Sequence, residues 1–436
     1  MASTEIITDP TTAKPLVRKQ DVAALSRLLS EPSEVAERRL AGWRQYQVTP
    51  LPDPVRHLWR YTDPAKLLPP APFQLPEPGG MSAPSPAPEG SAVAVLRPGW
   101  PPQIRLSEAA AATGLRLTSL GSSAELGEWL GAMVAPDHGL FEALNSALWT
   151  AGLVIFVPRG VVAAEPVRVL VPAGGPSALP RILVVAQQDS ELTLVEDHFG
   201  GDAGGKVVGV TEIHAGAGAR IRHGLIERWG PKTNGHLTTR MHLERDAQGA
   251  LMVSALGGGQ VKLDVGAELL GEGSHSELGA IALGAGRQHL DLHTVHRHRA
   301  PHTSSNMNIK VALRDRAHSA TTGLIEIEED APGSEAYQEA RNLLLSPRCR
   351  ADAIPELQIH NREVQCTHGA TSSPVDPEQL YYLQSRGIPR TEALQLVVRG
   401  FFEGALTGLP SGLRDATVDH LDERLANWGG SPRAGA

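Results

Sequence analysis

The residue types best suited to metal chemistry gather in one segment of this 436-residue chain, residues 348–371. The segment holds both cysteines, Cys349 and Cys366, and His368 lies two residues after the second one. Soft and borderline metal ions prefer thiolate sulfur and imidazole nitrogen, so the segment raises the question of a metal or iron–sulfur site. The alternative is that both cysteines are small buried apolar residues. Spacing alone favours this alternative, because neither CxxC nor a second cysteine pair completes a four-ligand site.

A second group of potential ligands consists of five histidines between residues 289 and 302: His289, His293, His296, His298 and His302. In an extended strand His289, Asp291 and His293 share one face, and His296 and His298 share a face of their own. One interpretation is a metal site with Asp291 as ligand or supporting partner. We favour a structural role, because no spacing here matches a familiar catalytic zinc pattern. In that role these residues form a ladder of hydrogen bonds between successive coils of a repetitive β fold, and the imidazoles lie on a solvated face.

Several short motifs of this chain resemble those of a known protein family. They are Trp59-Arg60-Tyr61-Thr62, His289-x-Asp291-x-His293-Thr294, Pro301-His302-x-Ser304-Ser305, Arg341-Asn342-Leu343-Leu344-Leu345, Pro355-x-Leu357, Val364-x-Cys366-x-His368-Gly369-Ala370-Thr371 and Tyr382-Leu383-x-Ser385-Arg386-Gly387-Ile388. Together they resemble the SufB/SufD family, the scaffold of the SUF iron–sulfur cluster assembly machinery. The resemblance covers nearly the whole chain, from Val35 to Phe402, and its C-terminal block is highly specific.

Within that family the HGAT motif is most like SufD, because SufB usually carries a glutamate where Gly369 stands. Cys349, however, occupies the position of the functionally important SufB cysteine. A SufB-like cluster-holding scaffold is therefore the first alternative.

The resemblance implies a right-handed parallel β-helix that is not an enzyme. It implies pairing with a SufB-like subunit, or with a second copy as a homodimer, and docking of a SufC-like ABC-type ATPase on the C-terminal helices. His368, Cys349 and Cys366 would lie near the subunit interface and handle iron or a nascent cluster. We expect no tightly bound cofactor, although iron or a cluster could bind transiently.

Composition limits the other possibilities. The formal net charge of −8 argues against nonspecific binding to nucleic acid or an anionic membrane. No apolar run is long enough to span a bilayer, and the first residues do not resemble a secretory signal. Two cysteines form no disulfide framework, so we expect a reducing cytoplasm. No phosphate-binding loop or nucleophile elbow is present. A β-helix enzyme acting on carbohydrate or acyl groups is therefore the weaker alternative.

Local patterns divide the chain into five regions. These are an N-terminal helical region (1–67), a Pro/Gly/Ser-rich linker (68–90), a mixed α/β lead-in (91–150), a parallel β-helix core (151–374) and a C-terminal helical domain (375–436). In the first, Ser33 is a candidate N-cap, and Leu29, Val35, Leu40 and Trp43 can line one apolar side. In the lead-in, a strand at 92–98 precedes helical patterns at 124–134 and 139–149.

The core region predicts a mainly β fold. From Ala151 onward, short runs with period-two alternation follow one another without an intervening helical pattern, which argues against βαβ units. A small residue recurs near strand starts, at Ser190, Gly218, Gly249, Ser274, Ala317 and Cys349. Most of these intervals have room for two strands, as in a solenoid. An antiparallel sandwich is the competing fold, and the family resemblance decides for the β-helix.

The last sixty residues predict three helices. Asp376 and Thr391 are candidate caps of the first two. The middle helix carries an apolar stripe of Leu394, Val397, Val398, Phe401 and Leu406, which we expect to pack partly against the end of the solenoid. The family resemblance adds the ATPase, with Leu394, Val398, Phe401 and Phe402 as the predicted partner-binding residues. Adjacent helical residues diverge in direction, so only one of the two phenylalanines is expected to face the partner. We also expect the solenoid to fold without residues 376–436.

Overall fold

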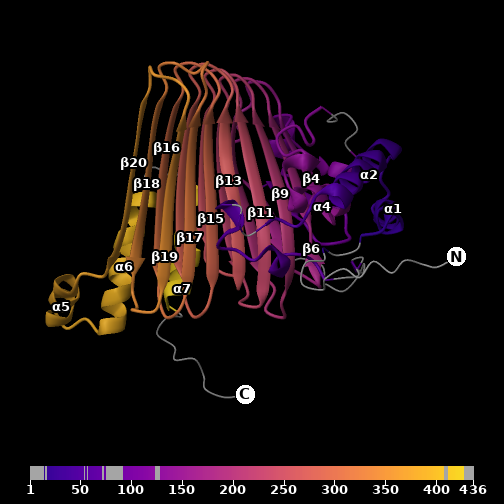
Figure 1. Cartoon of the computed structure of the whole chain (residues 1–436). Coiled ribbons are helices and arrows are strands. Elements are labelled where there is room, and N and C mark those ends of the chain that lie inside the picture. The colour runs from indigo at the N-terminus through magenta and orange to yellow at the C-terminus, as the bar shows by residue number, and fades with distance from the viewer. Residues whose placement is uncertain are drawn as a thin grey trace.

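The computed structural model describes residues 14, 17–53, 55, 57–70, 73–74, 92–122, 128–406 and 411–426. Its centre is a parallel β-solenoid of about eight turns, with helical segments before and after it in the chain, so the predicted fold class is confirmed (Figure 1). The strands form two ten-stranded sheets. Sheet A has the order β2-β1-β5-β8-β10-β12-β14-β16-β18-β20, and sheet B has the order β19-β17-β15-β13-β11-β9-β7-β4-β3, with β6 beside β9.

The strand bounds are β1 Ala92–Val95, β2 Gln103–Arg105, β3 Arg116–Ser119, β4 Ala151–Val157, β5 Val167–Pro172, β6 Ser177–Ala178, β7 Pro180–Ala186, β8 Glu191–Gly200, β9 Gly205–Ala215, β10 Arg220–Trp229, β11 Thr233–Leu243, β12 Gln248–Ala255, β13 Gln260–Leu269, β14 His275–Gly284, β15 His289–His298, β16 Ser304–Leu313, β17 His318–Ile327, β18 Glu335–Leu344, β19 Arg350–Ile359 and β20 Gln365–Pro374. The helix bounds are α1 Lys19–Leu28, α2 Ser33–Val48, η1 His57–Trp59, η2 Pro64–Lys66, α3 Glu108–Ala112, η3 Leu120–Ser122, η5 Pro136–His138, α4 Leu140–Leu148, α5 Pro377–Ser385, α6 Arg390–Leu406 and α7 Ser411–Ala426.

From β7 onward, consecutive long strands alternate between the two sheets, so one coil contributes one strand to each sheet. Every pairing among β4 to β20 is parallel, which excludes the antiparallel sandwich. His289 pairs with His318, 29 residues further on. The prediction that each repeat contains two strands is therefore confirmed. The small residues taken as markers of the repeat, however, do not all precede strands of the same sheet: Ser190 and Ser274 precede strands of sheet A, and Ala317 and Cys349 precede strands of sheet B.

The core lies between the two sheets and is mostly aliphatic. Period-two alternation places one side chain in two in this interior; on β15 these include Leu290 and Leu292. The opposite faces are covered by helices. α1, α2 and α4 pack on the outer face of sheet B near the N-terminal end, and α6 and α7 pack on the outer face of sheet A. The apolar stripe of α6 thus covers a side of the solenoid and not its end, which corrects the sequence prediction.

Several local predictions were off by a short distance. α2 begins at Ser33 with Pro32 as its N-cap, and α6 begins at Arg390, before Thr391. Asp376 does cap α5, because its side chain accepts a hydrogen bond from the N–H of Glu378. Residues 128–134 form turns where a helix was predicted, and residues 123–127 lie outside the described part.

The N-terminal region packs closely against the solenoid. Most of the predicted linker 68–90 lies outside the described residues. The part that is described contains Leu68 and Phe73, and both are buried together with the N-terminal helices. Leu29, Leu40 and Trp43 border this same cluster, whereas Val35 belongs to a neighbouring one.

Candidate functional site

The solenoid ends in two bare strands, β19 in sheet B and β20 in sheet A. Each is the last strand of its sheet in the described part of the chain. Their residues are mostly half-buried or exposed, whereas those of β8 to β17 are mostly buried. β18, β19 and β20 lie at the end opposite the N-terminal helices (Figure 1). Unpaired backbone groups at this end form a template on which another strand could pair.

The register shows which backbone groups face outward. In β19, the N–H groups of Arg350 and His360 donate to Ala317 and Ile327 of the preceding coil, so alternate residues from Ala351 onward direct their N–H away. Pro355 occupies one of these outward positions, where a missing donor breaks no internal hydrogen bond.

The edge of β20 keeps its donors. The N–H of Gln365 donates to Ser334, so the outward positions are the even-numbered ones from Cys366 to Ser372. None of these four is a proline; the strand meets its first proline at its last residue, Pro374. The edge of β20 is therefore the more complete template of the two.

Cys366 and His368 lie on the same face of β20. They pair with Ala336 and Gln338 of β18, which are buried, so both side chains project toward the mouth of the solenoid interior. Cys366 is half-buried against the core, and burial raises the pKa of its thiol to about 11. His368 is exposed. The structure thus brings together a protonated thiol and an accessible imidazole on one open edge.

Cys349 lies elsewhere. It ends the turn before β19 and is buried, with Sγ 3.0 Å from the carbonyl oxygen of Ser346 and 3.3 Å from that of Leu313. The ten residues of β19 separate it from the turn that leads to Cys366, and ten strand residues span roughly 33 Å. Both cysteines are free, and they lie at opposite edges of the same coil. Sequence proximity therefore does not group Cys349 with Cys366 and His368.

The histidine cluster alternates as predicted, but its environment differs. Asp291 and His293 lie on the outer face of sheet B, and His296 and His298 point inward, where Ser276 and Ser305 are hydrogen-bond partners. The predicted hydrogen bonds across coils are present, for example between His293 and Asp264. The predicted solvated face is wrong for His293, His296 and His298, which are buried, whereas His289 is half-buried and His302 is exposed. Burial lowers the pKa of His296 to about 3 and that of His298 to about 4, so both are neutral.

Two of the recognised motifs meet on the outer face of sheet B. The segment containing Trp59 and Thr62 crosses this face as a strap. Trp59 stacks on Phe141 with ring centroids 5.1 Å apart, and the Nζ of Lys262 lies 5.1 Å from the Trp59 ring centre. Thr62 donates a hydrogen bond to Asp291. The N-terminal motif therefore packs on the histidine motif. This contact could not be predicted from the sequence, because the two motifs lie far apart in the chain.

A buried polar group inside the solenoid was missed by the sequence analysis. Glu196 accepts hydrogen bonds from His198, His223 and Thr211 between the sheets. Burial would raise its pKa, but the two histidines hold it well below the usual range. Glu227, also buried, accepts hydrogen bonds from the backbone N–H groups of Trp229 and Gly257, and burial raises its pKa to about 7. The sequence signal that could have identified Glu196 and Glu227 is their place in the period-two alternation of their strands, at positions that point into the solenoid interior.

The predicted partner-binding residues of α6 divide by exposure. Val398 and Phe402 are fully buried against sheet A, so in this conformation they have no surface to offer. Leu394 and Phe401 are half-buried, and the ring centre of Phe401 lies 5.3 Å from the Nζ of Lys310.

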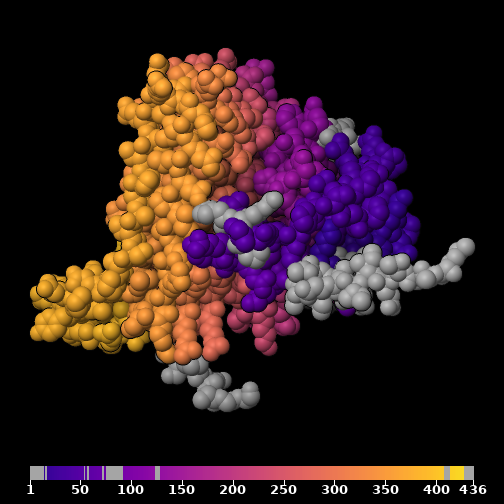
Figure 2. Space-filling view, in the orientation of Figure 1, coloured from indigo at the N-terminus to yellow at the C-terminus, as the bar shows by residue number. Residues whose placement is uncertain are grey.

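Other apolar side chains in this region are more exposed. They are Tyr381, Tyr382 and Leu396. α5, which carries both tyrosines, projects from the body of the molecule at the lower left of Figure 2. The exposed apolar surface of the C-terminal region is therefore centred on α5 and not on the stripe of α6.

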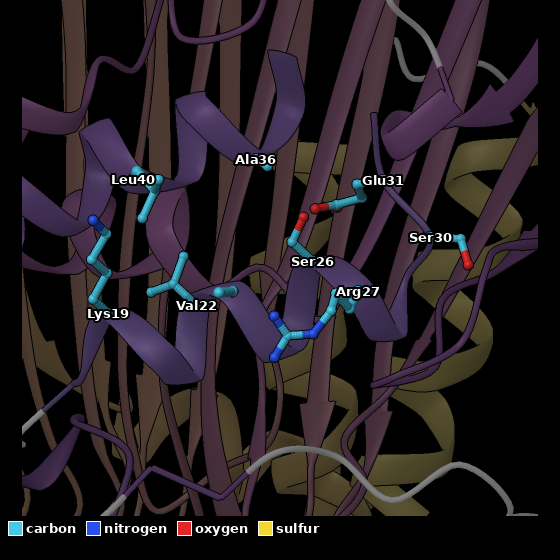
Figure 3. Close-up of a pocket in the computed structure, with 9 residues that line it drawn as sticks. Lys19, Val22, Ser26, Arg27, Ser30, Glu31, Ala36 and Leu40 are labelled. Carbon is cyan, nitrogen blue, oxygen red and sulfur yellow. The ribbon is translucent and has the colours of Figure 1, made fainter. Parts of the chain in front are cut away.

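A groove of about 580 Å³ lies between α1 and α2, with Val22, Leu40, Ser26 and Arg27 among its lining residues (Figure 3). Glu31 at its margin is already held by Arg39. No metal-binding group of three or more His, Cys, Asp or Glu side chains occurs among the described residues. Within that same part of the chain, no helix is long and apolar enough to cross a membrane.

Comparison with known proteins connects these features to a family. Residues 169–401 match the family model of the SUF system FeS cluster assembly, SufBD core domain. The chain is 29% identical to the iron–sulfur cluster assembly protein SufD of Bacillus subtilis over 300 residues, 67% of this chain and 68% of that protein. It is 32% identical to a SufBD family protein of Mycobacterium tuberculosis over 272 residues, 60% of this chain and 66% of that protein. It is 28% identical to SufB of Bacillus subtilis over 282 residues, 64% of this chain and 61% of that protein.

The matched region runs from β5 into α6 and contains Cys349, Cys366 and His368. Identity to SufD and to SufB is nearly equal, so overall similarity does not separate the two subfamilies.

Proposed function

The chain belongs to the SufBD family of iron–sulfur cluster assembly proteins, and on that basis we propose that it is a SufD-like, non-enzymatic scaffold subunit of a cytoplasmic SUF complex. It pairs through its open end with a SufB-like subunit, with a second copy as the other possible occupant. A SufC-like ATPase docks on its C-terminal helices. Iron or a nascent cluster binds transiently at the open end, and no cofactor is bound tightly.

The observation that carries this proposal is the bare edge of β20 with Cys366 and His368 on it. A ten-residue edge without proline before its last position favours pairing with another strand. Imidazole and thiolate at the resulting junction suit iron. The raised pKa of Cys366 means that metal binding must displace its proton, and a neutral imidazole beside it can accept that proton.

The pairing is tested with two substitutions at one position. Ala370 is exposed and its N–H faces outward. Ala370→Pro removes that N–H without breaking a hydrogen bond to β18, whereas Ala370→Thr keeps it. We expect the proline variant to lose binding to a SufB-like subunit in size-exclusion chromatography with light scattering, and the threonine variant to bind normally. Equal binding by both variants would show that pairing does not use this edge.

The ATPase proposal is tested on α5. Deletion of residues 376–436 is unsuitable, because α6 and α7 cover apolar residues of sheet A, so the expectation that the solenoid folds without them is not supported. Tyr381→Ala combined with Tyr382→Ala leaves that packing untouched. We expect it to weaken binding of a SufC-like ATPase at least tenfold in a calorimetric titration. Tyr337→Ala is the control, because Tyr337 is also exposed but lies on β18. Unchanged affinity in the α5 variant would remove α5 from the docking surface.

The chemical role of His368 is tested by His368→Ala. We expect normal folding and normal ATPase binding but slower cluster formation in a complete assembly mixture. Normal assembly by this variant would leave His368 with no chemical role.

A SufB-like, cluster-holding role is the second candidate, supported by Cys349. Its burial and its contacts with two carbonyl oxygens make the SufD-like role the better-supported one. Retention of a reconstituted cluster by the isolated protein, and its loss in Cys349→Ser, would reverse that order.

A further inference from the structure

Two histidines face each other on the outer face of sheet B. His289 of β15 and His318 of β17 are register partners. Their ring centroids are 4.9 Å apart and their Nδ1 atoms are 3.1 Å apart. Neither residue belongs to the open edge described above, and the proposed function assigns no role to this pair.

The far nitrogen of His318 is held by a carboxylate. Its Nε2 lies 2.8 Å from Oδ2 of Asp352, and Arg350 donates to the other oxygen of the same carboxylate. A carboxylate can only accept a hydrogen bond, so Nε2 carries the proton. In the neutral ring the lone pair is then on Nδ1.

The far nitrogen of His289 is held by the strap. Its Nε2 lies 2.8 Å from Oγ1 of Thr62. The single hydroxyl proton of Thr62 is directed to Asp291, whose Oδ2 also accepts from Lys262 at 2.8 Å. The hydroxyl oxygen must therefore accept from His289, which places the proton on Nε2 and the lone pair on Nδ1.

The surrounding network thus fixes both tautomers so that two lone pairs meet at 3.1 Å. Such a pair repels unless a cation lies between the nitrogens or beside both of them. The candidates are a shared proton and a metal ion. Supporting groups on the far nitrogens are a characteristic of metal-binding histidines, which usually donate their other N–H to a carboxylate, a carbonyl or water.

We propose that His289 and His318 form a binding site for one borderline divalent metal ion, with Asp352 and Thr62 as the groups that orient the two imidazoles. Metal–nitrogen bonds of about 2.0–2.1 Å to atoms this far apart would enclose roughly 100°, close to a tetrahedral angle. Imidazole suits zinc, copper, iron and nickel. The His318 side chain is 28% exposed, so water can occupy the remaining coordination positions and the ion can exchange.

The test is a calorimetric titration of the full-length chain with Zn²⁺ at pH 7.5. Cys349→Ser and Cys366→Ser are included in every variant to remove thiol ligands. We expect one saturable site that is lost in His289→Ala and in His318→Ala. We expect Asp352→Asn, which keeps both rings but weakens their support, to lower the affinity 10–100-fold. His275→Ala is the matched control, because this histidine lies on β14 and bonds to Ser304 and Glu277; its removal should change nothing.

X-ray absorption of the Zn²⁺-loaded protein gives an independent measurement, with imidazole scattering expected from two ligands. Thermal melts show whether each variant is folded; if His289→Ala unfolds, the half-exposed His318→Ala carries the test. Zn²⁺ binding that is equally tight in wild type, His318→Ala and Asp352→Asn would overturn the proposal and leave a shared proton only.

Discussion

The two ends of the solenoid are finished in opposite ways. At the N-terminal end, sheet A stops at β2 and sheet B at β3, which are three and four residues long and pair antiparallel with their neighbours. At the C-terminal end the last strands, β19 and β20, are each ten residues long and parallel to theirs. Short edge strands resist further pairing, and long exposed ones invite it. One end is built to stop the stack and the other to continue it.

Buried charge distinguishes the same two ends. Near the N-terminal end, Arg181 donates to Glu212 at 2.6 Å and Arg39 donates to Glu31 at 2.5 Å, and all four side chains have almost no exposed surface. Near the open end, the side chains of the Arg341–Glu339 pair are 52% and 21% exposed. Buried pairs fix a single arrangement because losing one partner is costly. The exposed pair constrains its surroundings little.

The largest expected effect is therefore at the N-terminal end. Arg181→Met leaves Glu212 buried without its charged partner; among the described residues, the backbone N–H groups of Gly131, Met133 and Val134 remain as its donors. We expect the free energy of unfolding to fall by about 3–5 kcal/mol, measured by urea denaturation. Arg341→Met is the matched control and should cost about 1 kcal/mol or less. Similar losses in both variants would contradict the contrast between the ends.

A pH effect of comparable origin comes from Glu142, which joins α4 to β11. Burial raises its pKa, but hydrogen bonds from His236 and Thr238 outweigh burial and lower it to about 2. The unfolded chain titrates this carboxyl near its ordinary value of 4.5. Its stabilising contribution is thus fully present above pH 4.5 and is lost as the pH falls toward 2.

We expect this contribution to be about 3 kcal/mol or less, since each unit of pKa difference corresponds to about 1.4 kcal/mol. Unfolding free energies of wild type and Glu142→Gln, measured from pH 6 to pH 2.5, should converge as the pH falls. A constant difference between the two proteins would mean that Glu142 does not titrate in this interval.

These contrasts also show what the sequence could and could not predict. Alternation of residue character placed His289 and His293 on one face and His296 on the other, because the period of a strand is two. It could not show that the outer face at Asp291 is covered by the Trp59 segment, since that cover comes from a distant part of the chain. Asp291 and His293 are buried on the covered outer face, whereas His296 and His298 are buried because they point into the interior between the two sheets, so the predicted solvated imidazoles were wrong.

The grouping of the three candidate site residues was predicted only in part, because separation along the sequence does not give the distance between residues on different strands. Cys366 and His368 stay together because two residues of one strand share a face. Cys349 is 17 positions before Cys366 in the sequence. Because the whole of β19 lies between them, the two thiols are near opposite ends of that strand. Stripe positions on α6 were identified correctly as apolar, yet periodicity does not say which surface an apolar stripe will cover.

The open end is expected to be accessible but chemically quiet before a partner or metal arrives. Because burial raises the pKa of Cys366 to about 11, little thiolate exists at pH 8. We expect iodoacetamide to modify Cys366 on the order of 100-fold more slowly than an unfolded cysteine. The rate is measured by mass spectrometry in a Cys349→Ser background, with the urea-unfolded protein as control. Equal rates in folded and unfolded protein would show that Cys366 is an ordinary surface thiol.

The smallest expected effect compares one glycine from each end. A Cβ at Gly42 of α2 would lie 2.7–2.8 Å from atoms of Ser146 and Ala147 on α4, so Gly42→Ala should cost about 1–3 kcal/mol through overpacking, partly offset by the roughly 1 kcal/mol gain in helix propensity. A Cβ at Gly369 of β20 would meet only the Tyr337 hydroxyl, 3.9 Å away. Since glycine within a strand is destabilising by roughly 0.5–1 kcal/mol relative to alanine, Gly369→Ala should leave stability unchanged or raise it by about that amount. Thermal and urea unfolding of the two variants measure the difference directly. A loss of stability in Gly369→Ala as large as that in Gly42→Ala would mean that the C-terminal edge is packed as tightly as the N-terminal one, and the distinction between an end that stops the stack and an end that continues it would fail.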